Sequence, residues 1–293
     1  MNSDLLNLKE NRDHGDFNIL LSSYEGNIND TFPEVVLHWH KEIEITLILK
    51  GTAQYKIDFS TYIVKEGDIV IISPESLHSI NQINSETMEW VTIVFSLDML
   101  KSHFTDGCSL RYISPILNKS YKLPAIINAD TYGYSKIYSI IENIFNTYAE
   151  KDVAFELELK SLLFSLFANL YKYNCIHIEN NSSELTYDIQ NKIKSILNYV
   201  KDNYSTDISI EEVASLCNFS EYHFMRFFKK YVGTSCLQYI NNYRLEKAAE
   251  LLKSTSFSIT EISFECGFNN LSYFNKLFKR KYNLTPREFR DNI

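Results

Sequence analysis

The spacing of hydrophobic residues differs between the N-terminal part of the chain and the part that follows. Between residues 32 and 96, short runs rich in β-branched residues, such as EITLILKG, TAQYKIDF, TYIV, DIVIISP and WVTIVF, are separated by turn-forming stretches such as KEGD at 65–68. Runs of this length and composition are typical of β-strands. Many short strands at close spacing favour a small antiparallel barrel or jelly roll in the N-terminal half.

From about residue 130 the apolar positions recur every three to four residues. The stretch VAFELELKSLLFSLFANLYKY (153–173) predicts an amphipathic helix with one broad apolar stripe. The members of this stripe are Phe155, Leu159, Leu162, Leu163, Leu166 and Leu170. Two interpretations stay open, namely packing of this helical region on the barrel and dimerisation through it.

The C-terminal part contains an internal repeat. SIEEVASLCNFS (209–220) matches SITEISFECGFN (258–269), and FMRFFKK (224–230) matches FNKLFKR (274–280). Each copy opens with a Ser-x-x-Glu capping box, reaches an Asn or Gly that can end a helix, and then starts a second helix. This order predicts two helix-turn-helix motifs, because a chance pair of amphipathic helices would not repeat at a near-constant offset.

A longer helix is predicted between the two copies, over TSCLQYINNYRLEKAAELLKS (234–254). Twenty helical residues span about 30 Å, and one turn of B-DNA is about 34 Å. A connecting helix of this length could hold the second helices of both motifs in successive major grooves.

Charge is unevenly distributed along the chain. The whole chain carries a formal net charge of −8, whereas residues 220–290 contain twelve Lys and Arg against six Asp and Glu, a net charge of +6. The rest of the chain therefore carries −14. A basic C-terminal part in an otherwise acidic chain indicates that the basic part binds a polyanion.

Residues 189–292 resemble the DNA-binding domain of AraC/XylS-type transcriptional regulators. The resemblance rests on IEEVASLCNFSEYHFMRFFKKYVGTSCLQYI (210–240), RLEKAAELL (244–252) and ITEISFECGFNNLSYFNKLFKRKYNLTPREFR (259–290). It implies an all-α domain of seven helices with two helix-turn-helix motifs, at about 209–231 and 258–281. It also implies double-stranded DNA and RNA polymerase as partners.

By position in that family, particular side chains are expected to contact DNA. Those expected to read bases are Tyr222, Met225, Arg226, Leu271, Ser272, Asn275 and Lys276. Those expected to contact phosphates are Ser220, Lys229, Lys230, Asn270, Lys279 and Arg280. The chemistry of Arg226 agrees, since a guanidinium can pair with both acceptors of a guanine edge. Leu271 departs from the polar residue often found at its position, so contact with a thymine methyl and simple packing both stay open.

One polar cluster stands out in the strand-rich half. HWHKEIE places His38, His40 and Glu44 at even separations, which share a face on a strand, and His78 follows the next apolar run. The pattern is similar to the cupin motif pair, although Ser76 stands where cupin enzymes usually have Gly. We expect these four residues to line an effector pocket, and no metal or cofactor is expected. A divalent metal site and purely structural histidines stay open as alternatives.

Together these features imply a two-domain α+β protein. Residues 1–174 are expected to form a cupin-like effector-binding barrel with a C-terminal helical pair used in homodimerisation. Residues 175–188 are expected to form a polar linker, and residues 189–293 the DNA-binding domain. The expected function is transcriptional regulation, as an activator that responds to a small molecule such as a sugar. The protein is not expected to be an enzyme, and the alternative is a metal-dependent cupin enzyme tethered to DNA.

The remaining signals concern location. The N-terminus, MNSDLLNLKENRDHGDF, lacks the cationic start and apolar core of a signal peptide, and no apolar run is long enough to span a bilayer. The five cysteines are odd in number and show no CxxC spacing, as is usual for reduced thiols. A cytoplasmic protein without membrane contact is therefore expected.

Overall fold

The computed structural model describes residues 20–101, 106–178 and 184–291, which form two compact units. The first unit comprises residues up to 27, 39–78 and 82–182, and the second comprises residues 28–38, 79–81 and 183–293. No helix within the described ranges is long and apolar enough to cross a membrane.

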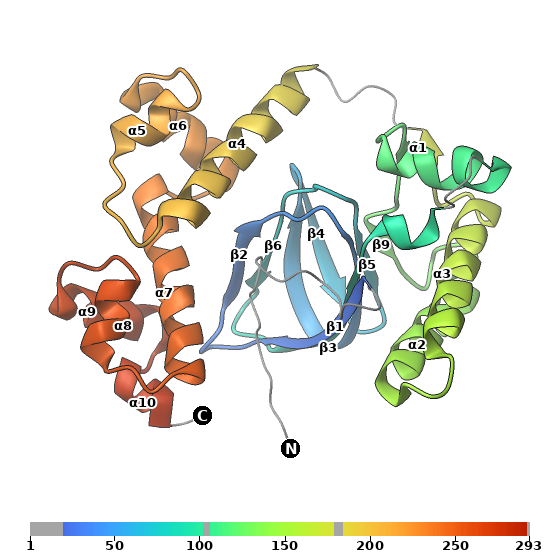
Figure 1. The fold of residues 1–293 in the computed structure, drawn as a ribbon, viewed down its shortest axis with the longest axis horizontal. Coiled ribbons are helices and arrows are strands. Elements are labelled where there is room, and N and C mark those ends of the chain that lie inside the picture. The colour runs from blue at the N-terminus through green and yellow to red at the C-terminus, as the bar shows by residue number, and fades with distance from the viewer. Residues whose placement is uncertain (1–19, 102–105, 179–183, 292–293) are drawn as a thin grey trace. The chain divides into compact units, whose positions relative to one another are not determined.

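The first unit is built on an antiparallel sheet (Figure 1). Strand β3 (Ile43–Ile57) lies at its centre and pairs with β4 (Ser60–Lys65), β5 (Ile69–Ile72) and β7 (Met88–Phe95). Strand β1 (Leu21–Ile28) lies beyond β7, and β9 (Ile126–Ile127) lies beyond β5. A separate two-stranded sheet joins β8 (Tyr121–Lys122) to β10 (His177–Ile178).

The structure differs from the sequence prediction in β3. The runs EITLILKG and TAQYKIDF, predicted as separate strands, form this single strand of 15 residues. Its register against β7 shifts between Ile48 and Lys50, and Gly51 follows with a φ of +80°. A Cβ at Gly51 would overlap the carbonyl oxygen of Thr87, so glycine is required where the strand passes β7 this closely.

Two helices complete the core of this unit. Helices α2 (Tyr134–Glu150) and α3 (Phe155–Lys172) pack on the sheet in one hydrophobic cluster, which includes Ile45 and Phe95 from the strands. Shorter helical turns at Leu97–Leu100, Ser109–Ile113 and α1 (Ser114–Leu117) precede them. Of the predicted stripe, Leu159, Leu163, Leu166 and Leu170 are buried in this core. The stripe itself therefore packs within its own unit.

Helices α4 to α10 form most of the second unit (Figure 1). They are α4 (Glu184–Asn203), α5 (Ile210–Ser215), α6 (Glu221–Val232), α7 (Cys236–Ser254), α8 (Ile259–Glu265), α9 (Leu271–Tyr282) and α10 (Pro286–Asp291). Strands β2 (Glu34–His38) and β6 (His78–Gln82) pair with each other. The expected fold class is confirmed, since a sheet-rich N-terminal part precedes an all-helical region with two helix-turn-helix motifs.

Local polar contacts fix the ends of these helices. Ser209 and Ser258 each accept a hydrogen bond from the backbone N–H of the Glu three residues later, at 3.1 and 3.2 Å, and both glutamates return the contact. In the turns that follow, Asn218 and Gly267 have φ values of +55° and +78°. These two positions therefore turn the chain sharply between the helices of each motif.

The expected linker is partly helical. Helix α4 begins at Glu184, inside the segment 175–188, and β10 occupies residues 177 and 178. Residues 179–183 lie outside the described ranges. The N-terminal unit also differs from the expected domain 1–174, because residues 28–38 and 79–81 group with the helices instead.

Candidate DNA-binding and ligand-binding sites

Helix α6 presents one apolar and one polar face. Phe224, Phe227 and Phe228 are buried, whereas Tyr222 and Met225 are 68% and 49% exposed. Three predicted contact residues, Arg226, Lys229 and Lys230, are also exposed. The Arg226 guanidinium carbon lies 5.7 Å from the centre of the Tyr222 ring. The residues expected to contact DNA therefore share the face of α6 that its core does not use.

Helix α9 repeats this arrangement. Phe274, Leu277 and Phe278 are buried, and the predicted contact residues Ser272, Lys276, Lys279 and Arg280 are exposed. Leu271 and Asn275 are half-buried. Leu271 packs against the core of the second motif, which agrees with the packing interpretation for this departure from the family pattern.

The helix-capping residues Ser220 and Asn270 have a local structural role. The side-chain oxygen of Ser220 accepts from the backbone N–H of His223 at 3.4 Å, and that of Asn270 accepts from Tyr273 at 2.9 Å. These contacts fix the start of each recognition helix. Contact of either residue with a phosphate stays a prediction.

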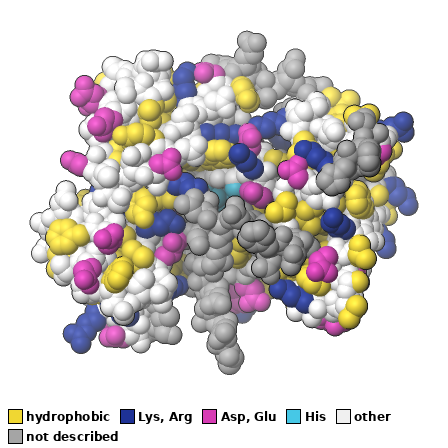
Figure 2. Space-filling view, in the orientation of Figure 1, with side chains coloured by type: hydrophobic (Ala, Val, Ile, Leu, Met, Phe, Trp, Pro, Cys, Tyr) yellow, Lys and Arg dark blue, Asp and Glu magenta, His cyan; other side chains and the backbone are white. Residues whose placement is uncertain are grey.

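Several cations counted in the basic segment have internal partners. Arg244 donates to the backbone carbonyls of Tyr204 and Thr206 at 2.7 and 2.6 Å. Lys247 pairs with Glu250 at 3.1 Å. On the face drawn in Figure 2, cations and anions are interspersed, so net charge alone does not mark a DNA-contacting surface. The exposed cations of α6 and α9 form a narrower set, and all of them are among the residues predicted to contact DNA.

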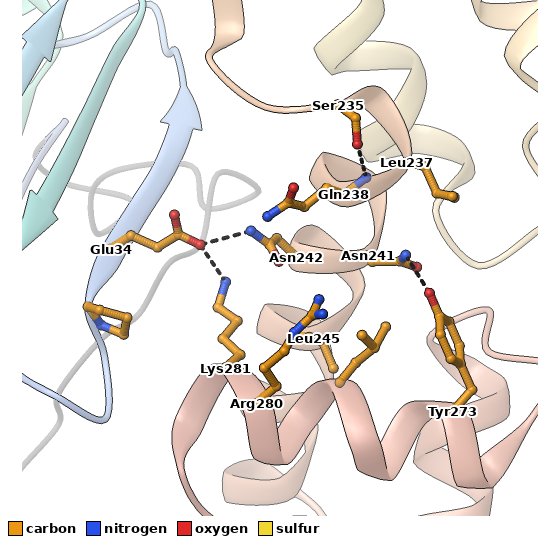
Figure 3. Close-up of a pocket in the computed structure, with 12 residues that line it drawn as sticks. Glu34, Ser235, Leu237, Gln238, Asn241, Asn242, Leu245, Tyr273, Arg280 and Lys281 are labelled. Atoms are coloured by element: carbon orange, nitrogen blue, oxygen red, sulfur yellow. Dashed lines mark hydrogen bonds and ion pairs between the residues drawn. The ribbon is translucent and has the colours of Figure 1, made fainter. Parts of the chain in front are cut away.

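Lys281 belongs to the basic run of α9, yet its side chain is largely buried. Its side chain is 9% exposed, and its Nζ lies 2.8 Å from Glu246 of α7 and 3.3 Å from Glu34. Asn242 of α7 also donates to Glu34, at 2.9 Å. Figure 3 shows Lys281 and Asn242 pointing toward Glu34, beside a pocket lined mainly by residues of α7 and α9. Burial raises the pKa of the Glu246 carboxyl to about 7, although Lys281 lowers it.

The segment 28–38 was not identified from the sequence as part of this unit. Besides Glu34, it contributes Phe32, whose ring makes edge contacts with Tyr282 and Phe289 at centroid distances of 5.5 and 5.7 Å. The carbonyl of Leu37 accepts a hydrogen bond from the Tyr239 hydroxyl at 3.0 Å. The sequence did not predict these contacts, because nothing in the residues around Phe32 and Glu34 indicates that they pack against helices more than 200 residues later.

The four polar residues predicted to act together do meet. His38, His40, Glu44 and His78 each offer one ligand atom, and these atoms all lie within 4.8 Å of one another. The Nε2 atoms of His40 and His78 lie 3.1 and 3.4 Å from Oε2 of Glu44. His78 is buried and the other three are partly buried. The three side chains converge for a different reason than predicted, because His38 ends β2, His40 lies in the connection that follows, and Glu44 lies in β3.

Neighbouring groups orient this cluster. Oε1 of Glu44 accepts from the Thr46 hydroxyl at 3.1 Å, and Thr46 in turn contacts the Thr92 hydroxyl across β3 and β7 at 2.7 Å. Burial would raise the pKa of Glu44, but hydrogen bonds and charges from His40 and His78 hold it well below its usual range. Glu44 is therefore an anion whose Oε2 faces the imidazoles.

Comparisons with known families match both parts of the chain. Residues 24–167 match the AraC-like ligand binding domain, and residues 199–292 match a helix-turn-helix domain. YdeC, an HTH-type transcriptional regulator of Bacillus subtilis (strain 168), is 28% identical over 97% of this chain and 96% of its own length.

Two further proteins resemble most of the chain. The HTH-type transcriptional activator RhaS of Escherichia fergusonii is 24% identical and covers 88% of this chain and 87% of RhaS. The crystal structure of ToxT from Vibrio cholerae covers 92% of this chain and 98% of ToxT, with a TM-score of 0.50 and 16% identity. At this identity, the likeness to ToxT concerns the fold alone.

Proposed function

Since the chain belongs to the AraC family of transcriptional regulators, with a ligand-binding and a helix-turn-helix domain, we propose that its own ligand-binding domain controls how it occupies DNA. The observation that carries this proposal is the shared architecture of α6 and α9. Helix α6 buries three apolar side chains and α9 buries four, and the cations of both helices other than Lys281 are exposed. Such a helix can enter a major groove without disturbing its own core.

On this proposal the two helices divide their contacts between bases and backbone. Base edges are read by Tyr222, Met225, Arg226, Leu271, Ser272, Asn275 and Lys276. Phosphates are contacted by Ser220, Lys229, Lys230, Asn270, Lys279 and Arg280. Lys281 is not part of this surface, because its ammonium group is committed to Glu246 and Glu34.

The N-terminal unit supplies the regulatory input. His38, His40, Glu44 and His78 form the proposed ligand site, and a bound ligand would shift the populations of DNA-binding and non-binding states. We propose that the protein activates transcription, because the RhaS relatives are named as transcriptional activators. The proposed setting is the cytoplasm, with RNA polymerase as a partner and no catalytic role for the protein.

A homodimer would use the outer face of α3. With its main stripe buried in the core, the helix keeps Leu157, Ser161, Phe164 and Ala168 exposed, at spacings of four, three and four residues. Leu157 is 72% exposed and Phe164 is 40% exposed. Small and apolar residues at this spacing form a second stripe on which a second copy of α3 could pack.

The test compares two cations on α6. In Arg226→Ala, affinity for the preferred operator should fall by about 1–3 kcal/mol, and selectivity at one base pair should relax. In Lys229→Ala, affinity for every sequence should fall alike, and the salt slope should drop by about one. Both are measured by fluorescence anisotropy on operator and random duplexes over a range of salt. Equal losses on both duplexes for Arg226→Ala would contradict its assignment as a base-reading residue.

A further inference from the structure

Residues 28–38 lie within the part of the sequence that matches the ligand-binding domain, yet they belong to the helical unit in the structure. Their neighbours in the chain, residues 27 and 39, belong to the first unit. The segment 28–38 is therefore a part of the helical unit that is tied at both ends to the chain of the ligand-binding domain.

A local turn shapes the start of this segment. Oδ1 of Asn29 accepts hydrogen bonds from the backbone N–H groups of Thr31 and Phe32, at 2.8 and 3.0 Å. Asparagine often forms such turns, because its side chain can bond to the backbone two residues later. The turn presents the ring of Phe32 to the rings of Tyr282 and Phe289, and Phe32 packs against the hydrophobic core of the second motif.

Polar contacts from the same segment reach α7 and the end of α9. The backbone carbonyl of Asp30 accepts a hydrogen bond at 3.0 Å from the side chain of Asn283, the residue that caps the C-terminus of α9. Oε1 of Glu34 accepts from Lys281 of α9 at 3.3 Å and from Asn242 of α7 at 2.9 Å (Figure 3). One carboxylate oxygen thus joins the last turn of α9 to α7.

Close packing alone does not fix α9 against α7 beside these contacts. A pocket of about 500 Å³ lies there, and Glu34 and Lys281 are among the residues that line it. Both helices contribute other lining residues, which include Asn241, Leu245, Tyr273 and Leu277. Side chains that face an open space lose the dispersion contacts of a filled interface. The contacts made by segment 28–38 are therefore important for the position of the last turn of α9.

We propose that Phe32 and Glu34 are positioning residues for DNA recognition by the second helix-turn-helix motif. The proposed phosphate contacts Arg280 and Lys279 lie one and two residues before Lys281, so a displaced last turn moves them as well. Phosphate contacts set the register and orientation of a protein on the duplex. Loss of the Phe32 and Glu34 contacts therefore weakens recognition by α9. The inference rests on the proposed function of α6 and α9 as DNA-reading helices.

The experiment uses the full-length chain and a duplex that the wild-type chain selects in vitro. Two further duplexes keep only one half-site each, and Arg226→Ala identifies the half-site read by α6. Glu34→Ala should weaken binding about fivefold on the intact duplex and on the half-site read by α9, but less than about twofold on the other half-site. Glu25→Ala, which removes an exposed carboxylate of β1, is the matched control and should leave all three affinities unchanged.

Hydrogen exchange measured without DNA tests the position of α9 directly. In Glu34→Ala and in Phe32→Ala, the backbone amides of residues 279–282 should exchange at least about threefold faster, whereas those of α6 should be unchanged. Circular dichroism and a titration far above the dissociation constant establish that each variant is folded and fully active. Glu34→Gln, which keeps an acceptor oxygen, takes the place of Glu34→Ala if that variant does not fold.

The outcomes separate this inference from the proposed function. Equal loss of affinity on both half-sites, unchanged affinity on all three duplexes, or unchanged exchange at the end of α9 would each overturn the inference. A wild-type chain that selects no DNA sequence would overturn the proposed function, and the exchange measurement would still decide whether segment 28–38 holds α9.

Discussion

Lys281→Met tests whether this cation stabilises the fold or contacts DNA. Methionine keeps the apolar stem of lysine and removes its ammonium group, with both its charge and its hydrogen bonds. The change leaves Glu246, whose side chain is 6% exposed, without the ammonium group that lies 2.8 Å away. Removing one partner of a buried ion pair typically costs about 3–5 kcal/mol. We expect the lower end, about 3 kcal/mol near pH 8, because Glu34, the second carboxylate, is 30% exposed and partly solvated.

The cost should depend on pH. The ordinary pKa of the Glu246 carboxyl is 4.5, and in the folded protein burial raises it to about 7 against the influence of Lys281. The folded state therefore binds this proton more tightly than the unfolded state, and the resulting stability is lost as the pH rises through about 7. Without Lys281 the folded-state pKa should rise further. The loss in Lys281→Met should consequently be small near pH 5 and largest near pH 8.

Urea unfolding followed by two probes measures this effect. Both tryptophans, Trp39 and Trp90, lie in the first unit, so their fluorescence reports on the sheet, while far-UV circular dichroism is dominated by the helices. Only the dichroism transition should shift. Lys279→Met, at an exposed position on α9, is the matched control and should change the unfolding free energy by less than about 0.5 kcal/mol. A loss for Lys281→Met that is independent of pH, or no larger than that of the control, would refute the ion-pair argument.

Two further variants test the N-terminal unit. His40→Ala should keep operator affinity in the absence of ligand within about threefold, or about 0.7 kcal/mol, and should remove or shift ligand-dependent transcription in a reporter assay. Unchanged induction at unchanged stability would show that the signal enters elsewhere. Leu157→Glu should weaken homodimerisation about 100-fold, since each copy loses roughly 1.5 kcal/mol of apolar burial. Analytical ultracentrifugation checks this, with Lys136→Glu on α2 as the control, and an unchanged dimer constant would exclude the outer face of α3.

The helix-turn-helix motifs could be predicted from sequence because their signals are local. The capping boxes at Ser209 and Ser258 involve residues only three positions apart, and the turns at Asn218 and Gly267 depend on the backbone freedom of single residues. The buried phenylalanines of α6 and α9 follow directly from helical periodicity.

The strand pattern was less informative in β3. A glycine between two β-rich runs indicates a turn as readily as a bulge, and only the pairing with β7 shows that the chain continues through Gly51. The assignment of residues 28–38 to the helical unit could not be predicted from local sequence either. Phe32 and Glu34 join the helical unit through Tyr282, Phe289 and Lys281, and no spacing rule relates residues so far apart.

By itself, the sequence determined the order of the elements, the repeat, the family and the residue types available for DNA and ligand. Each of these depends on neighbours within a turn or a strand. Tertiary structure decided how those residues are used. It buried Lys281 between two carboxylates while leaving Lys279 exposed, and it turned the Nε2 atoms of His40 and His78 toward Glu44. These outcomes depend on which distant side chains reach the same point, because burial and charge pairing are properties of the packed chain.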